Sequence, residues 1–111
     1  MKLQINQSGI TYYVELDKII YCKAERSYCI IFLLDEKEIL CSKSLRKLAE
    51  LLNYPNFVRI HNSYLININF VKKYVRCREH NCVIISNNNI KLPIARNRNH
   101  IFQEAMIKLT L

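Results

Sequence analysis

The residues best suited to chemistry stand in the stretch 59–67, where a base, an imidazole, amides and a hydroxyl are set among apolar positions. Asn62 can pair a donor and an acceptor with a base edge, Arg59 can bind a phosphate, and Ser63 can do either more weakly. If the apolar residues of the stretch are buried, His61, Asn62 and Ser63 stand on an exposed turn. The alternative is an ordinary strand end, at which Ser63 or Asn62 caps a turn.

Two further polar junctions resemble this stretch in character. The segments 25–28 and 96–99 carry arginine, serine and amide side chains, and each lies between apolar segments. If the three junctions gather at one end of a sheet, their loops form an edge whose polar side chains could contact the bases of a nucleic acid. The sequence has no helix-turn-helix pattern and no zinc-finger spacing. Tyr28 is the best candidate for an exposed aromatic side chain, and a stacking platform for single strands is disfavoured.

The charge of the chain is uneven. The net charge is +8, and residues 59–111 hold nine basic against two acidic residues, a net +7, while residues 1–58 hold eight against seven, a net +1. A basic field of this kind suits a polyanion, most simply DNA or RNA. The alternatives are a solvated basic face and an anionic membrane surface. No predicted helix is basic on one side and strongly apolar on the other, which disfavours the membrane.

The five cysteines and three histidines give little support to catalysis or metal binding. An odd cysteine count without CxxC spacing argues against a disulfide framework and a zinc site. Each cysteine stands in an apolar run, which predicts a buried, inert thiol in a reducing compartment. A single glycine excludes a phosphate-cradling glycine loop. We therefore expect no enzyme activity and no cofactor, and we expect the chain to be cytoplasmic.

The 111 residues suit one domain, and the hydrophobic patterns predict a mainly β chain with two helices. A hairpin is predicted around a turn at 6–9, and a tight turn is predicted at 87–89. Further strands are predicted at 19–24, 28–34, 38–41, 57–60, 70–77, 82–85 and 90–94. Chains of this kind close into sandwiches or barrels. The strand at 28–34 is apolar on both sides and should be central, whereas Pro93 marks an edge.

The two predicted helices differ in how clearly they begin. Apolar residues at helical spacing predict a helix over 42–53 with Ser44 as its N-cap. A second stripe of Ile101, Phe102, Ala105, Met106 and Leu109 predicts a helix at the end of the chain. Asn97 or Asn99 could cap it, and two arginines near its positive end would be relieved by a phosphate.

Four segments in order resemble the LytTR DNA-binding domain of bacterial transcription regulators. These segments are Ile19–Tyr28, Leu45–Leu52, Phe57–Asn67 and Leu92–Arg98. The third, with the run Arg-Ile-His-Asn-Ser-Tyr, resembles the most recognisable motif of the family. The four together, at the spacing of the family, are more specific than any one segment.

The resemblance implies an elongated arrangement of three small antiparallel sheets with two short helices. It also implies sequence-specific binding of double-stranded promoter DNA, in which loops enter successive major grooves from one side of a bent duplex. Two copies would read paired direct repeats. A receiver or sensor domain, or a kinase system, is the expected regulatory partner, and no membrane insertion is expected of this chain.

Site residues are carried over by position. The residues expected to contact bases are Arg26, Ser27, Tyr28, His61, Asn62 and Arg96. Those expected to contact phosphates are Lys23, Arg59, Ser63, Asn97 and Arg98. The chemistry agrees, because an arginine suits guanine and an asparagine suits adenine.

The chain departs from the family in two respects. Tyr28 stands where some members have a basic or imidazole side chain, which puts readout by the first loop in doubt. Members often carry a receiver or membrane domain before this one, and the sequence shows none, so that the chain is either a fragment of a longer regulator or a domain that stands alone. An alternative function is a protein-interaction module, an anti-regulator that keeps the fold without binding DNA. The basic second half is a feature that such a module would not need.

Overall fold

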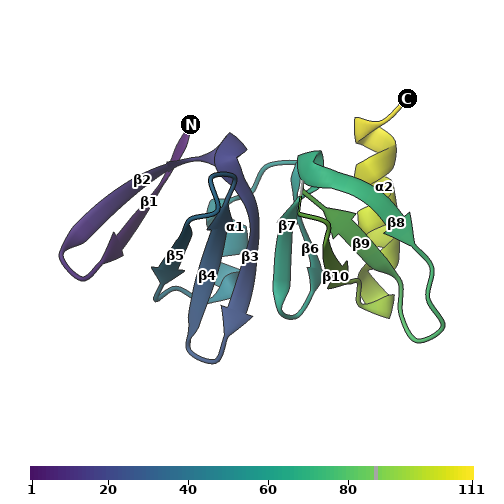
Figure 1. Cartoon of the computed structure of the whole chain (residues 1–111), viewed down its shortest axis with the longest axis horizontal. Coiled ribbons are helices and arrows are strands. Elements are labelled where there is room, and N and C mark those ends of the chain that lie inside the picture. The colour runs from purple at the N-terminus through teal and green to yellow at the C-terminus, as the bar shows by residue number, and fades with distance from the viewer. Residues whose placement is uncertain (87) are drawn as a thin grey trace.

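A computed structural model describes residues 1–86 and 88–111 of the chain, which measures 44 × 30 × 25 Å (Figure 1). Ten strands form three antiparallel sheets, and two α-helices accompany them. The strands are β1 (Lys2–Gln7), β2 (Ile10–Glu15), β3 (Ile19–Glu25), β4 (Tyr28–Leu33), β5 (Glu38–Cys41), β6 (Phe57–His61), β7 (Tyr64–Asn67), β8 (Val71–Val75), β9 (Cys82–Ile85) and β10 (Ile90–Pro93). The helices are α1 (Leu45–Leu51) and α2 (Asn99–Leu109), and short 3₁₀ helices span 16–18, 68–70 and 96–98. The mainly β, elongated architecture predicted from the resemblance is confirmed.

The three sheets are separate and open. β1 pairs with β2, the central sheet has the order β5-β4-β3-β7-β6, and the third has the order β10-β9-β8. The expectation of a barrel is therefore wrong, because each sheet ends in edge strands. β4 lies between two partners and β10 lies at an edge, as the apolar run and Pro93 predicted. The predicted hairpin is present, with Leu3 and Ile5 buried by alternation.

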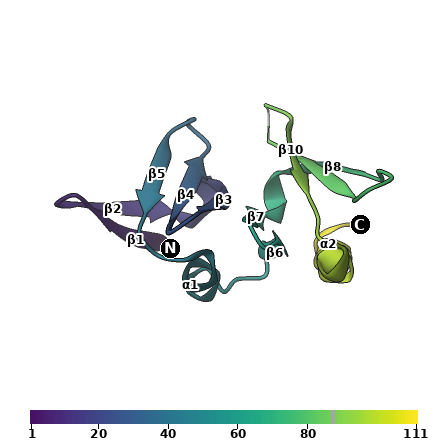
Figure 2. The same cartoon turned by 90° about the horizontal axis from the view of Figure 1, so that it is seen from below.

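Two hydrophobic clusters share the strands of the central sheet. Ile19 and Cys22 belong to the first cluster, and Ile20 and Tyr21 belong to the second. β3 is thus buried on both faces at its start, which a central strand requires. The first cluster is completed by α1 and the second by Phe102 of α2. Both helices lie toward the same side of the molecule (Figure 2).

The helix ends match the predictions only in part. The Ser44 hydroxyl accepts a hydrogen bond from the Lys47 N–H at 3.1 Å, so the predicted cap is confirmed. α1 begins at Leu45, three residues later than predicted. The caps predicted for α2 are wrong, because the residue before the helix is Arg98 and no side chain caps it. Ile101 and Leu109 of the predicted apolar stripe are exposed.

Several smaller predictions are corrected by the structure. Cys77 is exposed, because β8 ends at Val75 and not at Cys77, whereas the other four cysteines are buried. β10 ends at Pro93, one residue before its predicted end. Of the turn predicted at 87–89, Asn87 lies outside the described residues, and Asn89 has the predicted left-handed backbone with φ +53°. Within residues 1–86 and 88–111, no helix has the length and apolar character needed to span a membrane.

Candidate nucleic-acid interface

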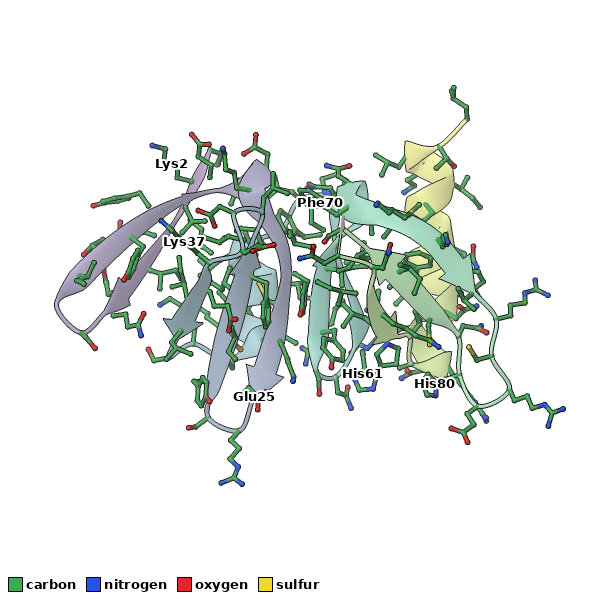
Figure 3. All side chains as sticks on the ribbon, in the orientation of Figure 1. Lys2, Glu25, Lys37, His61, Phe70 and His80 are labelled. Carbon is green, nitrogen blue, oxygen red and sulfur yellow. The ribbon has the colours of Figure 1, made fainter. Side chains whose placement is uncertain are left out.

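Three polar segments gather at one end of the molecule. The β3–β4 turn, the β6–β7 turn and the start of α2 lie at the lower end in Figure 1, and both termini lie at the other end. Glu25 and His61 point to that end in Figure 3, together with His80 of the β8–β9 loop. We call the segments 23–28, 59–63 and 96–98 the turn edge. The predicted convergence of the three polar junctions is therefore present.

Main-chain hydrogen bonds hold the segments of the turn edge in register. The Ala24 N–H donates to the Ser63 carbonyl at 2.9 Å, which joins the first segment to the second. The Ala95 N–H donates to the Ile60 carbonyl at 2.8 Å, which joins the second to the start of the third. Because backbone bonds of this kind are the same as those of a sheet ladder, the spacing of the segments belongs to the fold itself.

The first segment is a tight turn beside an ion pair. Glu25 pairs with Tyr28, so that Arg26 and Ser27 alone make the turn, and Arg26 has a left-handed φ of +43°. Arg26, Ser27 and Tyr28 are exposed, which confirms the prediction of an exposed aromatic. The Lys23 ammonium lies 3.0 Å from the Glu25 carboxylate, and this hydrogen bond raises the pKa of Lys23. Lys23 is therefore neutralised in part within its own turn.

The second segment is the most highly organised. His61 pairs with Tyr64, which leaves Asn62 and Ser63 at the tip of the turn. The Ser63 N–H donates to His61 Nδ1 at 3.0 Å, and the guanidinium of Arg59 donates to the carbonyl of Asn62 at 2.7 Å. These bonds leave the side chain of Asn62 exposed on a braced turn. His61 and Ser63 are half-buried.

The third segment follows Ala95 as a 3₁₀ turn. Arg96 and Asn97 are exposed, and Nη2 of Arg96 donates to the Glu79 carbonyl of the β8–β9 loop at 3.2 Å. Arg98 is half-buried, and its Nε is a buried donor without a hydrogen-bond partner among the described residues. Leaving a buried donor without an acceptor costs about 1–3 kcal/mol. This corner of the molecule therefore favours an added acceptor.

The segments that carry Arg59 and Arg98 are joined by the hydrogen bond from the Ala95 N–H to the Ile60 carbonyl. Partial burial, and then the positive charge of Arg98, lower the pKa of Arg59. The described ion pairs place a carboxylate on Lys23, Lys37, Arg46 and Lys47, but on neither of these two arginines. Two guanidinium groups on joined segments, neither paired with a carboxylate among the described residues, favour the binding of an anion.

The sequence reading missed the parts that support this edge. The sequence predicted no role for the β8–β9 loop, although its Glu79 carbonyl accepts a hydrogen bond from Arg96. The amide of Asn67 is fully buried, donates to the Ile19 carbonyl at 2.9 Å and accepts from the Asn69 N–H at 3.1 Å. The sequence alone did not predict this role of Asn67, because its partner Ile19 in β3 is 48 residues away in the chain.

A second polar network fixes the start of α2. The Tyr74 hydroxyl donates to Asn99 Oδ1 at 2.9 Å, and Asn81 Nδ2 donates to the Tyr74 oxygen at 2.7 Å. The amide that was predicted to cap α2 is thus used to attach the helix to the third sheet. This explains why the cap is absent and why the segment 96–98 is held in place.

Three buried thiols are poorly suited to act as nucleophiles. Burial raises the pKa values of Cys22, Cys29 and Cys82, which keeps these thiols protonated and weakly nucleophilic. Burial also raises the pKa of Tyr21 to about 12. Across the residues that the structure describes, no three His, Cys, Asp or Glu side chains come together as a possible metal site. The polar groups of the turn edge are therefore the best candidate site.

Comparison with known proteins agrees with this geometry. The family model described as the LytTr DNA-binding domain matches residues 9–107. No curated protein matches the chain. Among solved structures, the chain resembles the LytTr DNA-binding domain of a methyl-accepting/DNA response regulator from Bacillus cereus. That match has a TM-score of 0.80 and 18% sequence identity and covers 95% of each chain, so it shows a shared fold.

Proposed function

The chain belongs to the LytTr DNA-binding domain family, whose function is DNA binding for transcription regulation, and we propose that it recognises specific duplex sequences through the turn edge. The observation that carries this proposal is the joining of three polar segments by main-chain hydrogen bonds at one end of the molecule. A rigid edge of this kind can present side chains to successive major grooves without a recognition helix. The family is a DNA-binding one and not a catalytic one.

The base contacts are assigned to the exposed tips of the turn edge. Asn62 suits adenine and Arg96 suits guanine, because each side chain can make a paired contact with that base. His61 assists Asn62, while Arg26, Ser27 and Tyr28 approach the groove from the first turn. Arg96 must exchange its bond to the Glu79 carbonyl for a contact with guanine.

The phosphate contacts are assigned to groups beside those tips. Lys23, Arg59, Ser63, Asn97 and Arg98 flank the base-reading residues along the edge. Phosphate contacts fix the register and orientation of the protein on the duplex, and base contacts then supply the sequence preference. The net charge of +7 over residues 59–111 supports this assignment, because the same residues supply two of the three segments.

The assembly on DNA is proposed to contain two copies of the domain on direct repeats of a promoter. The expected setting is a bacterial cytoplasmic regulator under the control of a receiver or sensor domain, or of a kinase system. The competing proposal is an anti-regulator that keeps the fold and binds a protein instead of DNA. The uncompensated arginines at the turn edge favour the DNA-binding proposal.

Selection of bound sequences from a random duplex pool tests the function directly. The expected result is a half-site that recurs at a fixed spacing in direct orientation. The variant Asn62→Ala should select a degenerate base at one position of that half-site. Lys108→Ala is the matched control, because Lys108 is near the far end of α2 (Figure 1). Absence of duplex binding at low salt would favour the anti-regulator.

A further inference from the structure

Arg59 is placed to do more than bind a phosphate. Its Nη2 donates to the carbonyl of Asn62 at 2.7 Å, and its Nε donates to the carbonyl of His61 at 3.4 Å. A guanidinium carries five N–H donors, so these two bonds leave three for another acceptor. Arg59 can therefore brace the β6–β7 turn and bind an anion at the same time.

Arg98 supplies the second half of the same corner. The hydrogen bond from the Ala95 N–H to the Ile60 carbonyl, 2.8 Å long, brings the segment of Arg98 beside β6. Nε of Arg98 is buried without an acceptor among the described residues. An anion that binds this guanidinium would give Nε an acceptor and would also offset the repulsion between the two positive charges.

We propose that Arg59 is a positioning residue that shares one DNA backbone phosphate with Arg98 and braces the turn carrying Asn62 against that phosphate. The inference rests on the proposed function and deepens it. The phosphate holds the guanidinium, the guanidinium holds the carbonyls of His61 and Asn62, and these fix the side chain of Asn62 against its base. Backbone binding and base reading are coupled at this corner.

Substitution by lysine distinguishes the roles proposed for Arg59 and Arg98. Lysine keeps the positive charge but lacks the planar fork that can serve a carbonyl and a phosphate together. Arg59→Lys should therefore keep its attraction to any duplex while losing the brace on the turn. Arg98→Lys is the matched control, because the side-chain hydrogen bonds within the β6–β7 turn of the described structure are made by Arg59 and His61 and not by Arg98.

The test measures the affinity of each variant for a selected duplex and for a scrambled duplex. For Arg59→Lys we expect affinity for the selected duplex to fall about tenfold, and affinity for the scrambled duplex to change less than about twofold. For Arg98→Lys we expect both affinities to change by the same factor. If Arg59→Lys keeps the affinity ratio of the parent, the inference is wrong and the proposed function stands. If the parent itself shows no preference, the proposed function fails.

A second measurement uses the parent protein and does not depend on the folding of a variant. Neutral methylphosphonate linkages are placed one at a time along the selected duplex. At one linkage the parent should lose both affinity and its discrimination at the base read by Asn62. If every linkage lowers affinity without altering discrimination at any base, the coupling is absent and the inference is overturned.

Discussion

The β3–β4 turn and the Arg59–Arg98 corner lie at the same end of the molecule but balance their charges differently. In the turn, Lys23 lies 3.0 Å from Glu25, and both side chains remain about a third exposed, at 37% and 36%. In the corner, the ion pairs of the described residues leave both arginines without a carboxylate. The attraction of the edge for a phosphate backbone should therefore be concentrated in the corner, and the turn should contribute mainly shape and base contacts.

The two hydrophobic clusters of the interior also differ, in whether they contain thiols. The first hydrophobic cluster contains the thiols of Cys22, Cys29 and Cys41, whereas the second contains aliphatic and aromatic side chains only. Burial raises the pKa of Cys22, and Cys29 and Cys41 raise it further. Sensitivity to alkaline pH should therefore arise chiefly in the core beneath the first turn.

The largest expected effect on binding is the loss of affinity caused by Arg96→Ala, and a smaller loss is expected for Arg26→Ala. Arg96→Ala should weaken binding to the selected duplex by about 1–3 kcal/mol and relax the choice of one base, because a paired contact with guanine is lost. Arg26→Ala should cost less, since Arg26 lies in the β3–β4 turn, where Glu25 offsets part of the positive charge. Competition with duplexes carrying single base changes measures both effects. Equal losses without relaxed choice would show that Arg96 does not read a base.

Alkaline pH should destabilise the protein through Cys22 and Cys29 of the first cluster, whose pKa values are raised by burial. Above the ordinary pKa of a thiol, near 9, the unfolded chain loses its proton while buried Cys22 keeps its own. The free energy of unfolding therefore falls as pH rises, by up to about 1.4 kcal/mol per pH unit for each such thiol. Urea denaturation between pH 8 and pH 10 measures the slope.

Cys22→Ala should flatten that slope, because it removes the buried thiol whose pKa is raised. The slopes are compared and not the absolute stabilities, because Cys22→Ala also removes buried volume. A slope in Cys22→Ala equal to that of the parent protein would contradict the assignment of the pH dependence to the first cluster.

Lys23→Ala tests the compensated turn itself. Because a lysine contact with phosphate is independent of sequence, affinity should fall by a similar factor for all duplexes, and the salt slope should fall by about one at most. The effect should be smaller than that of Arg98→Met, since Glu25 already offsets part of the charge of Lys23. Titrations at several salt concentrations give both values. A larger loss of affinity for Lys23→Ala than for Arg98→Met would show that the β3–β4 turn, and not the corner, supplies most of the attraction for the phosphate backbone.

The sequence predicted the features that depend on neighbouring residues. Alternation predicted the hairpin around Gly9, the hydroxyl of Ser44 predicted a helix start, and Pro93 predicted an edge strand. The resemblance of four segments to a known family predicted the separate sheets, where composition alone favoured a sandwich or barrel. These features follow from local backbone preference and side-chain period.

The sequence failed where the partner of a group lies far along the chain. Asn99 has the right type for a cap, but its amide accepts from Tyr74, which is 25 residues away. Arg96 has the right type for a base reader, but its bond to the Glu79 carbonyl depends on a loop 17 residues earlier. Such contacts depend on how the sheets pack against one another, and no local sequence pattern predicts that packing.

Removal of the carboxylate of Glu25 is the smallest and sharpest test of the comparison. Glu25→Gln keeps the size of the side chain and its position opposite Tyr28, but it removes the charge that pairs with Lys23. An exposed pair of this kind is worth about 0.2–1 kcal/mol, so affinity should rise only two- to threefold. The rise should be similar for all duplexes and the salt slope should steepen, because a freed ammonium displaces one more counterion. If affinity and slope are unchanged, Lys23 does not face the DNA backbone, and the first turn approaches the duplex through Arg26 and Tyr28 alone.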